Sequence, residues 1–397
     1  MNKNKLLFPL VLLVLVGCAP IRTYETRPTP ASPVTSPETP SPEAGGIKVR
    51  VAIAARQYSV HLLAPENFVL SGFPMDGTPV VREGEKSFRE ATLTSDKLYS
   101  HKAYIEPLGE GEIQVNGKGY RGKMEIVEEG QGRLTVINEL SLEDYVMGVL
   151  AGEVPRNWPL EALKAQAVAA RTFAVFKRRE ARKKREAYDL ENSAQFQIYQ
   201  GSGLVNDNIR KAVLETRGNI LTYKGAPIPA FFHSNCGGRT ARALDVFTRD
   251  QPYLQSVSCP FDSGGPHYRW KAEIKVSDLL RKLHAEGIIL ADVVRFEPLS
   301  RDESGRIREI SLMDADGRSK KLKGTRFRMA VGPDIVRSTR FDAHLEGDKA
   351  VFTGRGWGHG VGLCQEGAYG MAVKGYAAFD ILRHYYQGII MEKLSEQ

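Results

Sequence analysis

The chain has 397 residues, of which 42% are hydrophobic and 26% charged, and this is the composition of an ordinary globular protein with room for two or three domains. A formal net charge of +8 favours anionic partners, such as nucleic acid, anionic lipid or anionic wall polymers. The charge does not choose among these partners, but the export signal described next argues against nucleic acid.

The first 17 residues predict a secretory signal peptide. Two lysines precede an apolar run over residues 6–16, which is too short to cross a bilayer. The tetrapeptide LVGC, which ends at Cys18, resembles a bacterial lipobox, and the resemblance implies cleavage before Cys18 and lipidation of its sulfur. Acyl chains would then anchor the protein at a membrane of the bacterial envelope, facing the wall or periplasm. The alternative is an ordinary secreted protein with a chance cysteine.

Residues 19–46 are rich in proline, serine and threonine and lack apolar periodicity, so together with Cys18 they form a predicted tether over 18–46. From residue 47 to about residue 137, short alternating stretches are separated by Gly, Pro and Asn, a pattern that predicts short strands. We therefore expect a β-rich N-terminal region over 47–125. Its role, whether in glycan binding or in spacing, stays open at this stage.

The period of the apolar residues then becomes helical. Ser141 and Asp144 have the spacing of a capping box, and Leu142, Tyr145 and Val149 recur on one face of the helix that follows. A second helix begins near residue 159, carries an alanine-rich stripe and ends in a basic run at 177–186. Those cations complement the negative end of the helix dipole, and a solvated face is the simplest interpretation of them.

The remainder of the chain mixes short strands and helices. Residues 219–235 predict two strands around a turn, residues 267–283 a strand followed by a helix, and residues 288–353 further strands. Residues 362–388 predict two helices separated at Gly375. The expected fold class is α+β, with helices and short antiparallel sheets around a substrate cleft, preceded by the β-rich region.

Two cations stand out on the alanine-rich helix. Lys164 and Arg171 are seven residues apart, so they share one face and lie about 10 Å apart along the helix axis. A buried cation needs a tertiary partner, because burying it alone costs several kcal/mol. A buried ion pair with Glu143, Asp144 or Glu153 is therefore the structural alternative to a role in a functional site.

Three cysteines follow the lipobox, and an odd number does not suit a disulfide framework. His233 and Cys236 lie three residues apart and Cys259 follows, which gives a set of soft donors suited to zinc. His267 or water is the candidate for a fourth ligand. A Cys236–Cys259 disulfide and a core histidine with free thiols are the alternatives. Cys364 is either a buried thiol or a further ligand.

Several motifs, in the correct order, resemble the stage II sporulation protein D and amidase-enhancer family. They are LSLEDYVMGVLAGEVPRNWPLEALKAQAVAARTFAV, FFHSNCGGRT, PYLQSV, GRGWGHGVGLCQEGAYGMA and ILRHYYQG. The resemblance covers about residues 130–390, and on this ground we expect a catalytic domain of that family over 126–390. The family usually has serine where this chain has Cys364, which is a departure from the family pattern.

The resemblance implies a peptidoglycan lytic transglycosylase, which cleaves the bond between N-acetylmuramic acid and N-acetylglucosamine in peptide-stripped glycan strands and leaves 1,6-anhydro ends. Some members are instead described as enhancers of a cell-wall amidase, which would be a partner. Carried over by motif, the catalytic acid is Glu153, and Lys164 and Arg171 face the site. Family members also carry zinc on a His and Cys set like His233, Cys236 and Cys259.

Other positions within these motifs are candidates for contact with sugar. The resemblance puts His359 and Gln365, in the glycine-rich loop, beside the catalytic glutamate. Gln197 and Tyr199 lie in ENSAQFQIYQG, which also resembles a family motif and would line the cleft. Trp158 lies in a loop fixed by two prolines, and it either stacks on a sugar ring or belongs to the core.

A single carboxyl group suffices for this chemistry. Glu153 protonates the leaving oxygen, and its carboxylate then takes the proton of the C6 hydroxyl that attacks the anomeric carbon. The first step needs a protonated acid near neutral pH, so the pKa of Glu153 must be raised by burial. A cation in direct contact opposes that rise, so we expect Lys164 and Arg171 to stand off from Glu153.

Overall fold

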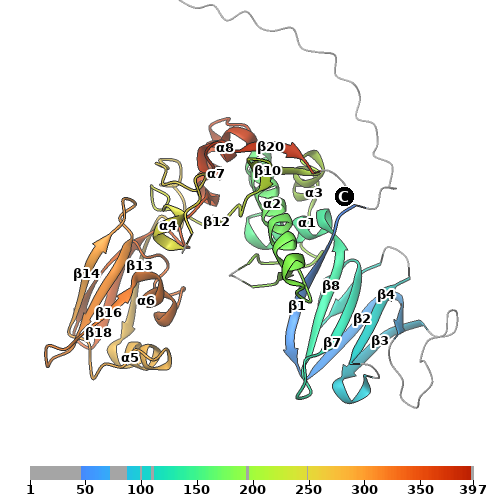
Figure 1. The fold of residues 1–397 in the computed structure, drawn as a ribbon, viewed down its shortest axis with the longest axis horizontal. Coiled ribbons are helices and arrows are strands. Elements are labelled where there is room, and N and C mark those ends of the chain that lie inside the picture. Colours follow the sequence, from blue (N-terminus) through green and yellow to red (C-terminus); the bar gives the residue numbers. More distant parts are fainter. Residues whose placement is uncertain are drawn as a thin grey trace, which may run out of the picture. The chain divides into compact units, whose positions relative to one another are not determined.

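The computed structural model describes residues 46–71, 87–98, 101–108, 111–193, 196–247 and 249–394, which belong to one unit (Figure 1). The predicted signal peptide, Cys18 and the tether up to residue 45 lie outside these residues. No helix within the described ranges is long and apolar enough to span a bilayer. The predicted α+β class is confirmed, since helices and several small sheets follow one another along the chain.

A nine-stranded sheet opens the unit, with the order β6-β5-β2-β4-β7-β8-β1-β9 and β3 paired to β2. All its pairs are antiparallel except β1 with β9. In β4, Ala103 and Ile105 are buried between exposed neighbours, the alternation of a sheet with one solvated face. The strands are β1 (Lys48–Gln57), β2 (Ser59–Ser71), β3 (Ser87–Thr94), β4 (Lys102–Pro107), β5 (Ile113–Val115), β6 (Lys118–Tyr120), β7 (Lys123–Glu128), β8 (Leu134–Ser141) and β9 (Leu190–Glu191).

The strands expected up to about residue 137 are present, and their sheet extends past residue 125, the limit expected for the β-rich region. β7 pairs with β4 and with β8, and β8 pairs with β1, so the strands up to Ser141 belong to one sheet. The limits 47–125 and 126–390 remain a prediction about domains.

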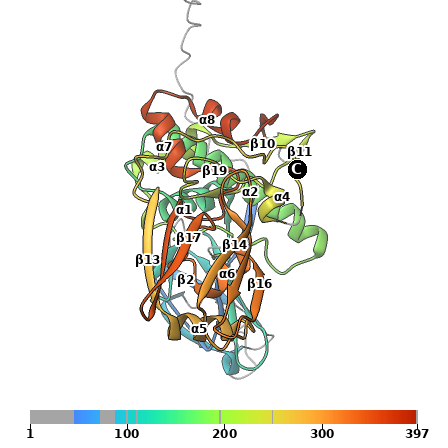
Figure 2. The same cartoon turned by 90° about the vertical axis from the view of Figure 1, so that its left-hand side faces the viewer.

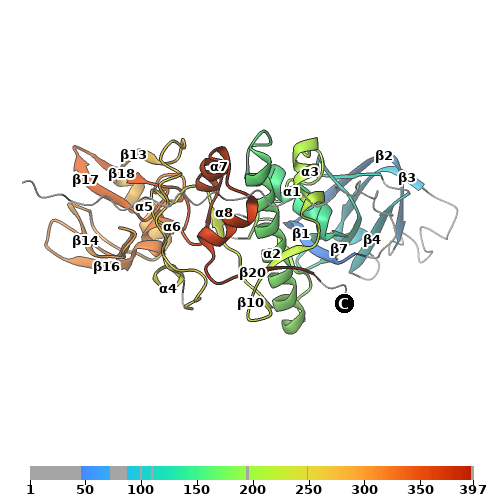
Figure 3. The ribbon, with the colours of Figure 1, turned by 90° about the horizontal axis from the view of Figure 1, so that it is seen from above.

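Two helices follow the sheet. α1 (Leu142–Glu153) begins after Ser141, whose Oγ accepts a hydrogen bond from the Asp144 N–H at 3.0 Å, and this confirms the predicted cap. α2 (Leu160–Lys184) begins after Pro159. The buried alanines of α2 allow close packing of α1, α3 (Asp207–Glu215), α7 (Gln365–Val373) and α8 (Ala378–Tyr385) against it (Figure 3).

A second core forms around the cysteines. β12 (Phe232–His233) pairs in parallel with β19 (Leu363–Cys364), which brings the predicted metal-binding loop beside the glycine-rich loop. α4 (Ala243–Val246) follows the former loop. β10 (Asn219–Tyr223) lies between β11 (Ala226–Pro227) and β20 (Ile390–Lys393).

Between α4 and α7, two three-stranded antiparallel sheets and two helices share a third core (Figure 2). The expectation of strands alone over 288–353 is corrected, because α6 lies there. Phe327, Ala330 and Val331 recur at helical spacing and are buried. The elements are β13 (Arg269–Lys275), α5 (Val276–Ala285), β14 (Arg295–Arg301), β15 (Ile307–Met313), β16 (Ser319–Lys323), α6 (Gly324–Val331), β17 (Phe341–Glu346) and β18 (Lys349–Arg355).

Candidate active site and metal centre

A cleft of about 760 Å³ lies where the C-terminal end of α1 meets the N-terminal end of α7. Its walls come from the turn after α1, from the loop 260–267 and from one face of α7. Glu153, Trp158 and Gln365, three of the residues predicted from sequence, line this cleft together. A volume of this size is that of a small-molecule or sugar-binding site.

Glu153 is the last residue of α1, where the helix dipole disfavours a negative charge. Its Oε1 accepts a hydrogen bond from the Ile198 N–H at 2.7 Å, and its Oε2 accepts one from Gln365 Nε2 at 3.5 Å. Burial raises the pKa of Glu153, and the two hydrogen bonds only partly oppose this rise. Within the described residues no cation lies within 4.0 Å of Glu153, so its environment favours the protonated acid.

Arg171 is fully buried and pairs with Glu143 instead of facing the cleft. Its Nε lies 3.0 Å from Glu143 Oε1, and its Nη2 lies 2.6 Å from Glu143 Oε2. The guanidinium also donates to the backbone oxygens of Val213 and Asn219. This bidentate pair with a carboxylate is the structural alternative weighed from the sequence, and it commits the charge of Arg171 to Glu143 rather than to Glu153.

Lys164 is likewise held away from the cleft. Its Nζ lies 2.9 Å from Glu161 Oε1 and 2.7 Å from Glu215 Oε2. The pair with Glu161 is the i,i+3 contact that a helix allows, and the pair with Glu215 joins α2 to α3. Neither predicted cation therefore lines the cleft that contains Glu153.

Trp158 lines the cleft beside Tyr369 of α7, with ring centroids 5.3 Å apart. Tyr369 is an exposed aromatic residue that our sequence reasoning did not select. Its signal in the sequence is only its place four residues after Gln365, one turn along the same helix. Two adjacent aromatic rings provide an apolar surface on which a sugar ring can stack.

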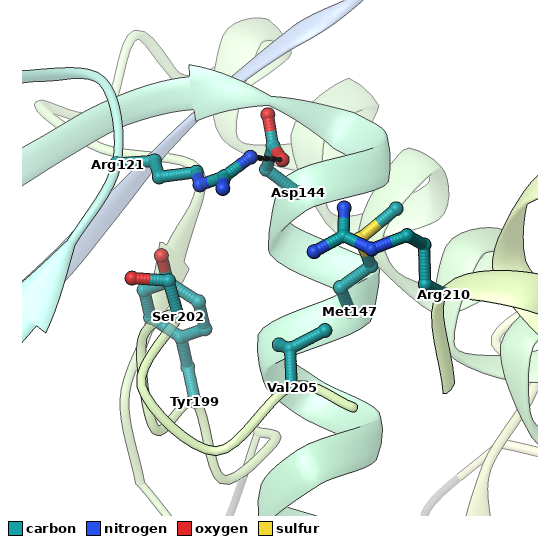
Figure 4. Close-up of a pocket in the computed structure, with 7 residues that line it drawn as sticks. All are labelled: Arg121, Asp144, Met147, Tyr199, Ser202, Val205 and Arg210. Atoms are coloured by element: carbon teal, nitrogen blue, oxygen red, sulfur yellow. Dashed lines mark ion pairs between the residues drawn. The ribbon is translucent and has the colours of Figure 1, made fainter. Parts of the chain in front are cut away.

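Gln197 and Tyr199 are buried in the fold rather than exposed in the cleft. Gln197 Oε1 accepts a hydrogen bond from the Tyr145 hydroxyl at 2.9 Å, and the Tyr199 hydroxyl donates to Asn138 Oδ1 at 3.1 Å. Figure 4 shows Tyr199 in a different pocket, near Arg121. With about 20 Å³ of space, that pocket has room for about one water and not for a sugar.

His359 is packed among His233, Phe231 and Phe247. Burial, with nearby arginines, lowers the pKa of His359 to about 4, so the ring is neutral at physiological pH. Its Nδ1 accepts the Val361 N–H at 3.0 Å, which holds the glycine-rich loop. The lining of the cleft does not include His359.

A cluster of three cysteines and an aspartate could bind a metal, and its membership differs from the predicted set. One ligand atom from each residue lies within 4.8 Å of every other, and all four side chains are buried: Cys236, Cys259, Asp262 and Cys364. The three cysteines are free thiols, so the Cys236–Cys259 disulfide alternative does not hold. Asp262 was missed; its signal is its place three residues after Cys259.

The predicted ligand His233 is directed elsewhere. Its Nδ1 lies 3.1 Å from the Val361 backbone oxygen, and its buried Nε2 has no partner in the described structure. Burial lowers the pKa of His233 well below its ordinary value. His267, the candidate fourth ligand, instead pairs through Nδ1 with Glu366, another residue of the cleft.

The chemistry of the four donors fits a soft, positively charged ion. The N–H groups of Gly237 and Gly238 donate to Asp262 Oδ2, while Asp262 Oδ1 is buried without a partner and is free for a ligand bond. Hydrogen bonds from the other two thiols lower the pKa of Cys259 to about 3, and the thiolate is the form that binds a metal. A carboxylate and three sulfurs are a donor set that zinc accepts.

Comparisons with known proteins agree with this architecture. The family described as Stage II sporulation protein matches residues 130–223, and a domain of unknown function, DUF8618, matches residues 248–362. A Bacillus amyloliquefaciens protein named Stage II sporulation protein D is 35% identical, over 64% of this chain and 74% of that protein. An uncharacterized protein of Brachyspira hyodysenteriae is 35% identical, over 69% of this chain and 73% of its own length.

A further relative is the Bacillus subtilis protein named Amidase enhancer, which is 27% identical over 75% of this chain and 48% of its own length. The matched residues 130–223 include α1, with Glu153 at its end, and the whole of α2. The motif resemblance, the fold class and these relatives agree, and the chain belongs to the stage II sporulation protein D family.

Proposed function

We propose that this protein is a lytic transglycosylase that cleaves peptidoglycan glycan strands, with Glu153 as the only catalytic acid and base. The observation that carries the proposal is a carboxyl group that lines a sugar-sized cleft, has a raised pKa and, in the part of the chain that the structure describes, has no cation within 4.0 Å. The names of the relatives, which refer to sporulation and to an amidase, support a role at the cell wall and in the envelope.

The steps need no water. Glu153 donates its proton to the glycosidic oxygen as the bond from C1 of N-acetylmuramic acid to that oxygen breaks. The C6 hydroxyl oxygen of the same sugar then forms a bond to C1, and the Glu153 carboxylate takes the hydroxyl proton. The acid is thereby regenerated, and the products are a free 4-hydroxyl and a 1,6-anhydro end. Gln365 holds the carboxyl group through its hydrogen bond to Oε2, and Trp158 packs against the sugar.

Digestion of peptide-stripped glycan strands, followed by mass spectrometry, tests this proposal. The wild-type protein should release oligosaccharides with 1,6-anhydro-muramic ends, and Glu153→Gln should reduce that release by about 10²- to 10⁴-fold. Glu309→Gln removes an exposed carboxylate of β15 and serves as the matched control. Anhydro products that persist in Glu153→Gln would refute the role of Glu153, whereas reducing ends would indicate hydrolysis by a muramidase.

The second candidate function is stimulation of a cell-wall amidase, and the relative named Amidase enhancer is the observation that favours it. In that case the cleft binds glycan without cutting it, and peptide release by an added amidase rises while glycan strands stay intact. Glu153→Gln separates the two functions, because the change from acid to amide removes proton transfer but leaves the cleft in place.

We also propose that Cys236, Cys259, Cys364 and Asp262 hold one zinc ion. Four protein ligands close the coordination sphere, so the ion has a structural role: it ties the loop after β12 and the loop before β13 to the start of α7. Cys364 directly precedes Gln365, so the cluster fixes the wall of the cleft next to the acid. Metal analysis of the purified protein should find one zinc per chain.

Three variants test this ligand set. Cys259→Ser and Asp262→Asn should lower the zinc content and the thermal stability, because each removes a ligand. His233→Asn should keep its zinc, because His233 lies outside the cluster. Zinc that is lost with His233→Asn but kept with Asp262→Asn would overturn the proposed set and restore the one expected from sequence.

The anchor at Cys18 remains a proposal that the described residues do not reach. Cys18→Ala should abolish labelling by a radioactive fatty acid and release the protein from the membrane fraction. Unchanged membrane attachment of that variant would contradict lipidation at this site.

A further inference from the structure

The region that matches the domain of unknown function contains a second large pocket, with a volume of about 590 Å³. Four arginines line it, from β13, β14, β18 and the turn before β17, together with a single acidic residue, Asp342 of β17. The proposed reaction makes no use of this pocket. The arginines are Arg269, Arg301, Arg340 and Arg355.

Only one of the four guanidinium groups is neutralised by the protein. Arg301 Nη2 lies 2.7 Å from Asp342 Oδ1. Among the described residues, no carboxylate lies within 4.0 Å of the other three. Arg340 donates to the Gly237 backbone oxygen, and Arg355 lies over the Tyr268 ring, 5.8 Å from its centroid. The pocket is therefore rich in hydrogen-bond donors and positive charge and poor in acceptors.

The strand register places two of these arginines opposite each other. Arg269 of β13 is the direct partner of Arg355 of β18. Like charges opposite each other destabilise an antiparallel pair, and in the described ranges no carboxylate lies within 4.0 Å of either arginine to relieve the repulsion. Gly305, at φ +80°, leaves room for Arg340, since a Cβ there would lie 3.3 Å from Arg340 Nε. An anion bound among these groups would remove the repulsion.

Residues that line the arginine pocket and residues that line the catalytic cleft are close together in the sequence. His267 lines the cleft and Arg269 lines the pocket. Two residues span at most about 7 Å even in fully extended chain, so the walls of the two cavities are near neighbours. A polysaccharide held in the cleft can therefore place one of its neighbouring sugar units in the arginine pocket.

We propose that the arginine pocket binds the free carboxylates of muramic acid residues in peptide-stripped glycan strands, and this inference rests on the proposed function. N-acetylmuramic acid carries a lactyl carboxylate, which a guanidinium can hold through two parallel hydrogen bonds. When a stem peptide is attached, that carboxylate becomes an uncharged amide and loses this interaction. The pocket thereby makes the enzyme select stripped strands over peptide-bearing ones.

Binding to uncleaved strands tests the inference separately from catalysis. The full-length Glu153→Gln protein is titrated with peptide-stripped glycan oligosaccharides and with the same oligosaccharides after reduction of their carboxyl groups to alcohols. We expect the reduced form to bind at least about tenfold more weakly, since a charged hydrogen bond contributes about 1.5–3 kcal/mol. Introducing Arg340→Met or Arg355→Met into the Glu153→Gln protein should weaken binding of the acidic oligosaccharides. It should also abolish the difference in affinity between acidic and reduced oligosaccharides.

Two controls keep the result interpretable. Arg295→Met removes an exposed arginine of β14 outside the pocket and should change neither affinity. Arg355→Met should leave the melting temperature unchanged or raise it, because it removes the repulsion with Arg269, so weaker binding cannot be ascribed to unfolding. A melting temperature that falls by several degrees would contradict the unrelieved repulsion on which the inference depends.

Three outcomes would overturn the inference. The first is equal affinity for acidic and reduced oligosaccharides, and the second is no detectable glycan binding. The third is tighter binding of a poly(glycerol phosphate) oligomer, lost with Arg355→Met, which would assign the pocket to a phosphate polymer. If Glu153→Gln still cut glycan while its binding depended on the arginines, the proposed catalytic acid would fail and the arginine pocket would stand.

Discussion

The buried pair of Arg171 and Glu143 gives a sharp test of whether the cations of α2 stabilise the fold or act on substrate. Glu143→Gln keeps the shape of the side chain but leaves a guanidinium that is 0% exposed without its counter-ion. Removing one partner of a buried ion pair costs about 3–5 kcal/mol. Unfolding entropy is about 2.1 cal/mol/K per residue, so for the unit at 46–397 the melting temperature should fall by about 4–7 °C.

The assay combines thermal unfolding with glycan cleavage measured well below the transition. Cleavage per folded molecule should be unchanged in Glu143→Gln, because the pair does not line the cleft. The double variant Glu143→Leu, Arg171→Met should recover most of the lost stability, because two matched apolar groups can replace a buried ion pair. A melting temperature within 1 °C of wild type, together with lost cleavage, would refute this reasoning and return Arg171 to the substrate-binding role that the resemblance implies.

Three further predictions concern the cleft and its supports. Burial raises the pKa of Glu153, so kcat/KM should fall on the alkaline side at a pH above the ordinary range of a glutamic acid. The same shift affects stability, because the protonated carboxyl group stabilises the fold at low pH and this contribution is lost as the pH rises through the folded-state pKa. The melting temperature of wild type minus that of Glu153→Gln should therefore decrease with rising pH, and a difference that stays constant would contradict the raised pKa of Glu153. Gly148→Ala should cost about 1–3 kcal/mol, because its Cβ would lie 2.4 Å from the Tyr199 ring, whereas Gly203→Ala meets nothing within 4 Å and should be neutral in chemical denaturation. Trp158→Ala should raise KM about 2- to 12-fold, the loss of an aromatic contact of about 0.5–1.5 kcal/mol; an unchanged KM would assign Trp158 to the core.

The family and the class of fold could be predicted from the sequence because both depend on local patterns. Ser141 caps α1 through a contact three residues away, and the helical spacing that follows it is visible in one dimension. The strand and helix over 267–283 and the two helices around Gly375 were also found for this reason. The short helix α6 was missed because it begins with glycine and spans only two turns between strands.

The site was only partly predictable, because tertiary contacts determine which of the residues in the motifs reach the cleft. Sequence motifs nominated both Arg171 and Glu153, yet burial against Glu143 separated the first from the cleft that contains the second. Asp262 carried no strong local signal as a ligand. It joins the cysteines because residues far apart in sequence converge there.

The sequence by itself determined which functional groups are present: a lone glutamate before a proline turn, soft sulfur donors and an excess of arginines. Those depend on residue type and on spacing within a few positions, which one dimension records. The tertiary structure decided which groups meet. The parallel pairing of β12 with β19 brings Cys236 beside Cys364, and the register of β13 with β18 sets Arg269 opposite Arg355. Such pairings are chosen by the packing of three cores, which no short stretch of sequence specifies.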